Sequence, residues 1–252
     1  MKLNYLQHKN KKPAIAYPTL AFLFVCLTIL LITGCDSKAP VYKDSFSNDS
    51  RFKKHWTIIN GTWTVADNSL TGDFNSDWTV ILGKKALPED FILTFDARME
   101  PKSVILEVIL GFKEEKYLGV YIYQIENVAA IADRSLFLNE KYVKQGTYIR
   151  STGNIGKLAK QPYQFNYEWM YWKIQKTGSQ LYIWINGEPV IAYNDTQGLL
   201  NSGGRLGFAV KGAAQIQDVR LFNTKNQELP APQGFAGKTE RKSEQPLFLF
   251  SE

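Results

Sequence analysis

The sequence predicts an all-β domain, either a two-sheet sandwich or a barrel, on three observations. Between Asp44 and Phe222 the chain alternates short apolar runs with turn signals, at a spacing of about 8–12 residues. The apolar runs are rich in Val, Ile, Thr, Tyr, Trp and Phe, which fit a pleated surface. No stretch shows a sustained helical period of apolar residues. Many short antiparallel strands of this kind are typical of sandwiches and barrels.

The predicted strands follow one another closely through this region. They are 56–59, 62–67, 78–83, 91–100, 103–112, 117–126, 169–177, 180–186, 188–194, 204–210 and 214–222. Asn186-Gly187, between two apolar runs, predicts a tight hairpin, because both central residues of a type I′ turn need positive φ. Further turns are expected at 177–179 and 201–204. The long polar segment at 144–166 predicts a functional or mobile loop.

The first 35 residues have the order of a bacterial lipoprotein signal peptide. Four lysines precede an uncharged apolar run at 20–32, which is too short to span a bilayer comfortably. The run ends in Ile-Thr-Gly-Cys at 32–35, which resembles a lipobox, whose cysteine is acylated and becomes the new N-terminus. We therefore predict lipidation at Cys35 and a place in the cell envelope, on the outer face of the cytoplasmic membrane or on the outer membrane. The alternative is an uncleaved N-terminal anchor, which also tethers the domain outside the cytoplasm.

Two further segments flank the predicted domain at 44–222. Residues 36–43 form a short linker. Residues 223–252 hold prolines, glycines and charges, which predicts a flexible, mostly disordered tail. The Leu-Phe-Leu-Phe end of this tail, at 247–250, could dock on a partner or on the domain.

Composition excludes several classes of function. The net charge is +6, but residues 1–35 hold four lysines and no acid, so the remainder has 26 basic and 24 acidic residues. That near balance does not favour nucleic-acid binding. Both cysteines, Cys26 and Cys35, lie near the N-terminus, so the predicted domain has no disulfide. Its only histidine is His55, which excludes a His-rich zinc site and is expected at the surface.

Four patterns, in the right order, resemble the concanavalin A-like jelly-roll superfamily. They lie at 44–73 (Phe…Trp…Gly-x-Trp-x-Val), 89–100, 172–195 (Trp-x-Ile…Ile-x-Ile-Asn-Gly) and 203–222. Within this group the chain is most similar to laminin-G-like domains and to the glycoside hydrolase family 16-related domain of the 3-keto-disaccharide hydrolase type. The resemblance implies a jelly-roll sandwich of two antiparallel sheets. One of these sheets is concave, and saccharides often bind there.

The chain also departs from its relatives. It lacks the Glu-x-Asp-x-x-Glu strand that carries the carboxylates of catalytic family 16 enzymes. It also lacks, at 99–108, the Asn-Ser-Gly that is common in the keto-sugar group. The resemblance further implies a structural calcium ion with Asp218 as a ligand. The alternative is pairing of Asp218 with Arg220 or Lys225.

Alternation along the predicted strands places polar and aromatic side chains opposite the core. If these faces line the same concave sheet, they form a groove suited to sugar, because rings cover pyranose faces and charged groups bond hydroxyls. The groove would contain Asp96, Arg98, Glu107, Tyr121, Tyr123, Tyr182 and Trp184. The alternative is ordinary sheet packing, since Tyr and Trp are good strand formers. Trp56, Trp63 and Trp172 are expected in the core.

Glu107 interrupts the apolar run of its strand, so its carboxylate must be exposed or paired. A structural ion pair with Arg98 is the favoured interpretation. The alternative is a catalytic acid or base with a raised pKa. In that case Asp96 would supply the second carboxylate of a catalytic pair.

The sequence thus predicts a lipid-anchored extracytoplasmic domain that binds carbohydrate without cleaving it. The first alternative is a glycoside-processing enzyme of the 3-keto-disaccharide hydrolase type, which would use Glu107 and Asp96 or residues of the 144–166 loop. The second is a protein-interaction module of an envelope complex. The expected partners are a glycan, the membrane through the lipid anchor and, in the second alternative, an envelope protein, but no nucleic acid. Apart from calcium, no cofactor is expected.

Overall fold

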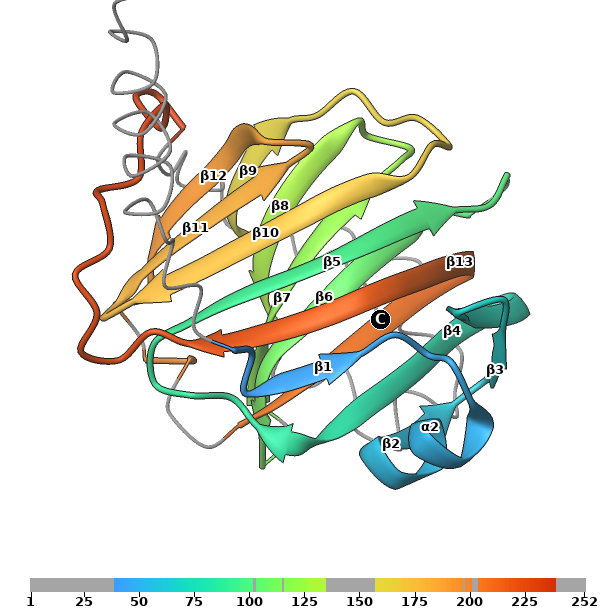
Figure 1. Ribbon diagram of the computed structural model, residues 1–252. Coiled ribbons are helices and arrows are strands. Elements are labelled where there is room, and N and C mark those ends of the chain that lie inside the picture. The colour runs from blue at the N-terminus through green and yellow to red at the C-terminus, as the bar shows by residue number, and fades with distance from the viewer. Residues whose placement is uncertain are drawn as a thin grey trace, which may run out of the picture. The chain divides into compact units, whose positions relative to one another are not determined.

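The computed structural model describes residues 39–101, 103–114, 116–134, 157–196, 198–200 and 204–238, without side chains at 74–77 and 157 (Figure 1). Cys35, residues 144–156 of the predicted loop and the 247–250 motif lie outside these residues. The prediction of a loop is wrong for 157–162, which forms a strand. Within the described ranges, no helix is long and apolar enough to span a membrane. The elements are β1 (Tyr42–Asp44), α2 (Asp49–His55), β2 (Trp56–Asn60), β3 (Thr62–Ala66), β4 (Ser69–Ala86), β5 (Phe91–Met99), β6 (Ile105–Lys113), β7 (Lys116–Tyr123), β8 (Val128–Asp133), β9 (Lys157–Pro162), β10 (Met170–Thr177), β11 (Gln180–Ile185), β12 (Glu188–Asn194) and β13 (Arg205–Asn223).

The strands form an antiparallel sandwich of two layers, and the last strand, β13, belongs to both (Figure 1). The second half of β13 pairs with β5, which continues through β10 and β11 to β12; we call this the front sheet. The first half pairs with β6, which continues through β7 and β8 to β9; we call this the back sheet. β4 runs beside β13, and β2 and β3 pair with β4. The predicted all-β jelly-roll sandwich is thereby confirmed.

β13 has a bulge where it passes from one sheet to the other. Its register against β4 shifts between Lys211 and Ala213, and Gly212 between them has a φ of 108°. A Cβ on Gly212 would lie 2.5 Å from the Cα of Ser103, so this position requires glycine. The sequence predicts two strands here, 204–210 and 214–222. The structure joins them, because a bulge interrupts the apolar pattern without ending the strand.

The space between the sheets is filled by one large apolar cluster. Trp56, Trp63 and Trp172 belong to it, as predicted, and Trp172 stacks on Phe95 with ring centroids 5.6 Å apart. Among the described residues, the first member of this cluster along the chain is Phe46. The part of the chain that starts at Ala39 therefore has a hydrophobic core of its own, and burial of that core is its main source of stability.

A buried carboxylate fixes the start of the fold. Asp44 accepts hydrogen bonds from the Trp56 indole at 3.0 Å, the Phe46 backbone N–H at 2.9 Å and the Tyr42 hydroxyl at 2.9 Å. Burial and the charge of Asp44 raise the pKa of Tyr42. These bonds tie β1 to the start of β2. The sequence does not predict β1 or α2, because elements of three and seven residues are too short to show a period.

The predicted hairpin between β11 and β12 is confirmed. Asn186 and Gly187 have φ values of 54° and 81°. The Asn186 side chain also holds β10, because its oxygen accepts a hydrogen bond from the Tyr171 N–H at 2.8 Å. The sequence does not predict β8, whose Val-Ala-Ala-Ile-Ala-Asp run is rich in alanine, a weak strand former.

The C-terminal segment up to Lys238 packs on the front sheet. Phe235 is 7% exposed, and its ring centroid lies 5.2 Å from that of Tyr182 and 4.9 Å from that of Trp184. The Ala192 N–H donates to the Lys238 carbonyl at 3.2 Å, so this segment also covers part of the edge strand β12. The C-terminal segment therefore packs on the domain well before the 247–250 motif, which the sequence indicates as a docking segment.

Candidate functional site

Each sheet has an outer face opposite the shared core. On β5 the core residues Phe95 and Ala97 flank Asp96, and on β6 the core residues Leu106 and Val108 flank Glu107. Asp96 and Glu107 therefore point outward from different sheets, because neighbouring side chains of a strand point to opposite faces. We call these outer surfaces the front face (β5, β10, β11, β12 and the second half of β13) and the back face (β6, β7, β8 and the first half of β13).

The predicted groove is divided between these two faces. The front face carries Asp96, Arg98, Tyr182 and Trp184, and the back face carries Glu107, Tyr121 and Tyr123. The condition that one sheet carries all seven is therefore not met, and one sugar cannot contact both sets. In particular, Asp96 and Glu107 cannot flank the same bond. Alternation separates outward from inward side chains, but it does not say which sheet a strand joins.

On the back face, Glu107 forms an ion pair with Arg134 instead of the predicted Arg98. The Arg134 Nη2 lies 3.1 Å from the Glu107 Oε2, and both side chains are 0% exposed. The guanidinium also lies over the Tyr121 ring, with its Cζ 4.7 Å from the ring centroid. Arg98 cannot take this place because it lies on the front face. Sequence reasoning missed Arg134 because it follows β8, the strand that was not predicted.

The back face is closed around this ion pair. A second buried apolar cluster surrounds it, consisting of Trp78, Val80, Leu82, Ile105, Ile109, Tyr117, Tyr121, Ala130, Ala132 and Ala209. Gly119 on β7 leaves the space for the carboxylate, since a Cβ there would lie 2.3 Å from the Glu107 Oε1. The back face is thus a packed surface with one buried charge pair.

Burial and charge act in opposite directions on Glu107. Removal from water raises the pKa of its carboxyl group, whereas the charge and hydrogen bond of Arg134 and the hydroxyl of Tyr117 lower it, and burial dominates. Burial likewise raises the pKa of Tyr121. In the structure, Arg134 engages one oxygen of Glu107.

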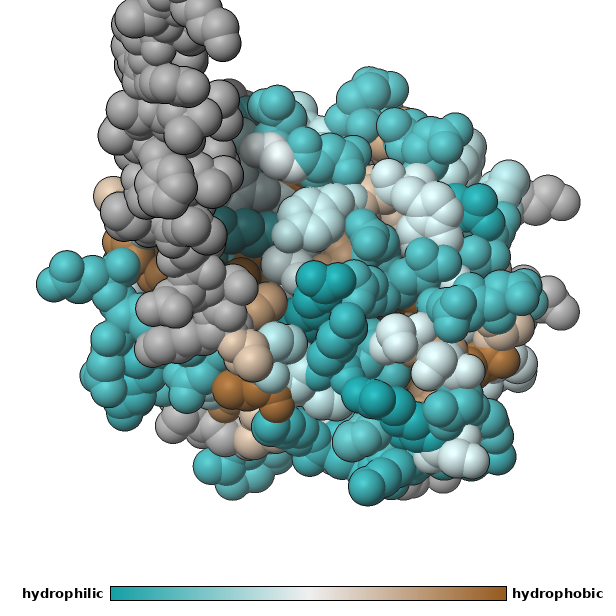
Figure 2. All heavy atoms as spheres, in the orientation of Figure 1, coloured by the Kyte–Doolittle hydropathy of each residue, from teal (hydrophilic) through white to brown (hydrophobic). Residues whose placement is uncertain are grey.

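The front face is a lattice of aromatic and polar side chains in cross-strand rows. In one row, Tyr171 of β10 lies beside Asp96 of β5, which lies beside Gln217 of β13. In the next row, Trp184 of β11 lies beside Lys173 of β10. Facing residues of neighbouring strands are about 5 Å apart, so each ring adjoins hydrogen-bonding groups. Figure 2 shows this face as mostly hydrophilic, with pale side chains of intermediate hydropathy between the teal ones.

Asp96 and Arg98 lie in this lattice with different partners. The Arg98 Nη2 donates to the Gln215 Oε1 at 3.0 Å and lies 3.5 Å from the Glu100 Oε1. The Arg98 guanidinium also lies over the Trp169 ring, with its Cζ 5.2 Å from the centroid. Partial burial and then the charge of Asp218 raise the pKa of Asp96, while Arg220 lowers it.

The aromatic residues of the front face differ in accessibility. Tyr171, which sequence reasoning missed, is 45% exposed. Trp184 is half-buried, because the Lys173 Nζ lies 4.5 Å from its ring centroid and the Phe235 ring packs on it from the C-terminal segment. Partial burial lowers the pKa of Lys173. Tyr171 is therefore the more accessible of these rings to a ligand.

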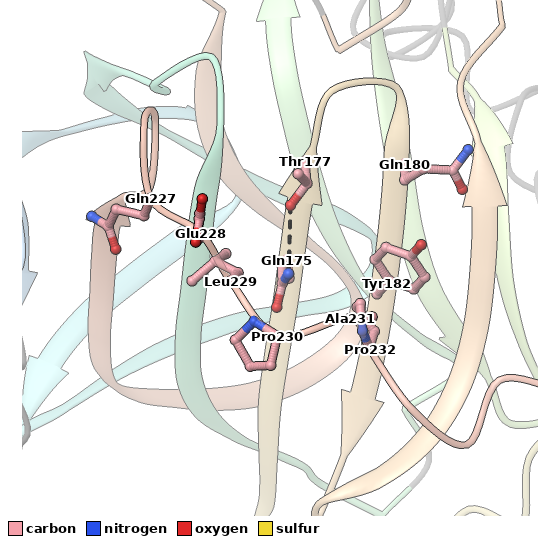
Figure 3. A pocket seen from close by; sticks show the side chains of 10 residues that line it. All are labelled: Gln175, Thr177, Gln180, Tyr182, Gln227, Glu228, Leu229, Pro230, Ala231 and Pro232. Atoms are coloured by element: carbon pink, nitrogen blue, oxygen red, sulfur yellow. Dashed lines mark hydrogen bonds between the residues drawn. The ribbon is translucent and has the colours of Figure 1, made fainter.

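A pocket of about 530 Å³ lies where the C-terminal segment crosses β10 and β11 (Figure 3). This volume falls within the range of about 300–1,000 Å³ that is usual for small-molecule sites. Its walls are Gln175, Thr177, Gln180, Tyr182 and the segment 227–232. The Gln175 Nε2 donates to the Thr177 Oγ1 at 3.4 Å. Amide and hydroxyl groups beside a tyrosine ring are suited to a neutral, hydroxyl-rich ligand.

The predicted calcium ligand Asp218 is engaged by an arginine. The Arg220 Nε donates to the Asp218 Oδ1 at 3.1 Å, and the Arg220 Nη2 donates to the Oδ2. Both carboxylate oxygens therefore face a cation, and the pairing with Arg220 that the sequence left as the alternative is present. Among the described residues, no group of three His, Cys, Asp or Glu side chains could hold a metal ion. A calcium ion, which takes six to eight oxygen ligands, would have to displace Arg220 from this carboxylate.

Comparison with known families identifies the class of domain. Residues 42–222 match the family of 3-keto-alpha-glucoside-1,2-lyase-like domains. The chain belongs to this family. The predicted resemblance to the 3-keto-disaccharide hydrolase type is thereby confirmed. A search of curated protein sequences gives no match to this lyase-like domain.

Solved structures that resemble this lyase-like domain are jelly rolls of low sequence identity. The carbohydrate-binding module CBM66 from Bacillus subtilis is 15% identical with a TM-score of 0.54, over 67% of this chain and 96% of the module. A Bacillus subtilis protein of unknown function with a galectin-like fold is 13% identical with a TM-score of 0.59, over 73% and 96%. The VIP36 exoplasmic/lumenal domain, in a Ca²⁺/Man3GlcNAc-bound form, is 12% identical with a TM-score of 0.51, over 69% and 86%. At these identities the likeness shows the fold.

Proposed function

We propose that this protein is a lipid-anchored, extracytoplasmic domain that binds carbohydrate on its front face without cleaving it. The observation that carries the proposal is the cross-strand row in which the exposed Tyr171 lies beside Asp96, with Gln217 on the other side of Asp96. An exposed ring can cover the apolar face of a pyranose while the neighbouring carboxylate and amide bond its hydroxyls. Similarity to CBM66 and to the sugar-bound VIP36 domain supports this proposal.

The positions of the carboxylates support binding without hydrolysis. Hydrolysis of a glycosidic bond usually needs two carboxyl groups on either side of that bond, about 5–10 Å apart. Glu107 points outward from the other sheet and cannot assist Asp96. On the front face, Asp218 influences Asp96, but Arg220 holds both oxygens of Asp218. Neither Glu107 nor Asp218 therefore provides a second free carboxylate for a sugar at Tyr171.

Lipid anchoring rests on the signal-peptide pattern that ends at Cys35 and on the start of β1 at Tyr42, shortly after it. Expression of the full chain with a labelled fatty acid tests this part. We expect label in the wild type and none in Cys35→Ser. Label that persists in Cys35→Ser would contradict a lipid at this thiol.

Native affinity electrophoresis across a polysaccharide panel tests the binding site. The chain from Asp36 to Glu252 is suitable, because it contains the compact unit that starts at Ala39. We expect retardation that is lost in Tyr171→Ala. Tyr167→Ala is the matched control, since Tyr167 is 42% exposed and its hydroxyl accepts from the Gln124 side chain at the β7–β8 turn, away from the front-face rows. Wild-type mobility unchanged by every glycan overturns the proposal.

A second candidate function is elimination on a 3-keto-α-glucoside, which the family description favours. In such a reaction a base removes the proton from C2, which the C3 ketone acidifies, and the C1 oxygen leaves. One base is sufficient, so the separation of Asp96 from Glu107 is no obstacle. Glu107, whose pKa is raised by burial, would be that base, and Arg134 would polarise the ketone oxygen, provided that the packing around this buried pair opens to admit the sugar.

Incubation with 3-ketosucrose separates the two candidates. Release of fructose by the wild type, lost in Glu107→Gln and kept in Tyr171→Ala, would support elimination at the back face. No release, together with glycan retardation that depends on Tyr171, would support binding alone. Unfolding curves of Glu107→Gln are needed beside the assay, because this substitution also removes a buried charge.

A further inference from the structure

The corner of the fold where the chain enters carries an unbalanced positive charge. Six exposed basic side chains come from β1, α2 and the end of β4: Lys43, Arg51, Lys53, Lys54, Lys84 and Lys85. We call this set the basic corner. β1 and α2 also contain two carboxylates, Asp44 and Asp49, which leaves the corner a net charge of +4.

Hydrogen bonds between these segments show that the basic side chains gather in space. The Lys84 Nζ donates to the Lys53 carbonyl at 2.8 Å, and the Lys85 Nζ donates to the Val41 carbonyl. The Arg51 Nη2 donates to the Lys43 carbonyl at 2.6 Å. The acceptors in these three bonds are neutral, so the bonds hold the cations in place without cancelling their charge.

Acidic groups compensate the basic corner only in part. Asp49 pairs with Lys53 at 2.5 Å, but both side chains are largely exposed, so solvent screens the pair. Asp44 lies 3.9 Å from the Arg51 Nε and is engaged by Trp56 and Phe46. Residues 36–252 carry a net charge of +2, so the rest of this part of the chain is negative overall. The charge of the domain is therefore polarised toward one corner.

The basic corner lies next to the proposed membrane anchor. Six residues, 36–41, separate Cys35 from the first residue of β1. Fully extended, this length of chain spans at most about 25 Å. A lipid on Cys35 would therefore hold the basic corner within reach of the bilayer surface. Such tethering raises the effective concentration of the corner at that surface.

We propose that the basic corner docks on the anionic phospholipid headgroups of the bilayer. The orientation that results rests on the lipid anchor of the proposed function, whereas the attraction depends only on the charges described above. Lysine and arginine near an anionic surface are attracted to it, and salt screens this attraction. In Figure 1, β1 and α2 lie at the edge of the fold away from β11 and β12, so docking leaves that part of the front face open to solvent.

Co-sedimentation with vesicles tests this docking on the soluble chain 36–252, which carries no lipid. Vesicles of phosphatidylcholine alone are compared with vesicles that also contain phosphatidylglycerol. We expect binding only to the second kind, and we expect added salt to reverse it. In Lys84→Glu/Lys85→Glu the apparent affinity should fall about tenfold or more, because four units of charge change at the surface.

A matched variant controls for net charge. Lys160→Glu/Lys238→Glu changes the same charge, but Lys160 lies on β9 and Lys238 lies beside β12, away from the corner (Figure 1). We expect this variant to bind as the wild type does. Equal losses in the two variants, or equal binding to the two kinds of vesicle, would overturn the proposal. Binding to heparin without binding to vesicles would also overturn it, and would point to a polyanionic partner.

The same variants keep this proposal separate from carbohydrate binding. Lys84→Glu/Lys85→Glu leaves the rows of the front face untouched, so its retardation by glycans should equal that of the wild type. Failure of every glycan to bind would remove the proposed sugar site and leave the vesicle result standing. If Cys35 is not lipidated, the proposed orientation of the domain on the bilayer is wrong, but the charge-dependent binding of the basic corner to vesicles is unaffected.

Discussion

Glu107 and Arg134 face each other at 3.1 Å on the back face, and neither side chain is exposed to solvent. Glu107 lies on β6 and Arg134 directly follows β8, and β7 lies between these two strands in the sheet. A pair that is buried to this degree has lost its hydration, so its mutual attraction must offset a large desolvation cost. Removing one partner leaves the other as an unpaired buried charge.

Arg134→Met should therefore destabilise the domain strongly. We expect a loss of about 3–5 kcal/mol in the free energy of unfolding, as is usual when one member of a buried pair is removed. The double variant Glu107→Leu/Arg134→Met should recover most of this loss, because it removes both charges. Urea denaturation followed by tryptophan fluorescence measures all three chains.

Arg98→Met is the control for this substitution. Arg98 pairs with Glu100 at 3.5 Å on the front face, and both side chains are 36% exposed. An exposed pair of this kind contributes up to about 1 kcal/mol. Similar losses for Arg98→Met and Arg134→Met would show that the Glu107–Arg134 pair is not buried in solution.

Gly119 should tolerate no side chain, because β7 passes directly beside the Glu107 carboxylate. A Cβ on Gly119 would lie 2.3 Å from the Glu107 Oε1 and 3.0 Å from the Arg134 Cγ. We expect Gly119→Ala to cost about 1–3 kcal/mol of stability, the usual range for overpacking. Gly83→Ala is the matched control, since its nearest contact would be 3.3 Å from the Leu206 carbonyl oxygen. A smaller loss at position 119 than at 83 would contradict the packing described here.

The sequence predicts the sandwich well because the alternation of apolar and polar residues within each strand indicates which of its side chains are buried. Phe95 and Ala97 alternate with Asp96 on β5, and this local pattern is visible in the sequence even when the neighbouring strands are unknown. Assignment of strands to sheets is different, because it depends on pairing with β13, which comes more than 90 residues later in the chain. β5 and β6 are consecutive in sequence, yet they pair with different halves of β13. This is why Asp96 and Glu107 look like neighbours in the sequence and lie on opposite faces.

Other parts of the site carry no local signal. Arg134 follows an alanine-rich strand, and nothing in its own neighbours indicates a buried partner 27 residues earlier. Phe235 lies in a segment whose prolines and glycines are typical of disorder, so its packing on Trp184 depends on the tertiary structure. Tyr171 follows the alternation of its strand, and that pattern alone could have placed it among the predicted groove residues.

Phe235→Ala should release the C-terminal segment from the front sheet. Phe235 is the buried contact of this segment with the rings of Tyr182 and Trp184. We expect faster cleavage by trypsin after Lys225 and Lys238, with little change in the unfolding midpoint, because the main core does not include this ring. Glu228→Ala, an exposed change in the same segment, should leave the cleavage rate unaltered. Unchanged cleavage in Phe235→Ala would mean that other contacts hold the segment.

Asp96 should make stability depend on pH in a direction that its environment sets. Partial burial and Asp218 raise its folded-state pKa above the ordinary value of 3.8. Between these two values the folded chain holds a proton that the unfolded chain releases, so the contribution of Asp96 to stability falls as pH rises through this window. Asp96→Asn cannot ionise, so its stability relative to the wild type should rise with pH across the window and level off above it. Urea denaturation at a series of pH values from below 3.8 to neutral measures this difference, with Asp67→Asn, an exposed turn position, as the control for loss of a carboxylate. A relative stability that falls with pH would mean that Arg220 outweighs burial and lowers the pKa of Asp96, which would also leave this carboxylate fully charged beside Tyr171 when a sugar binds.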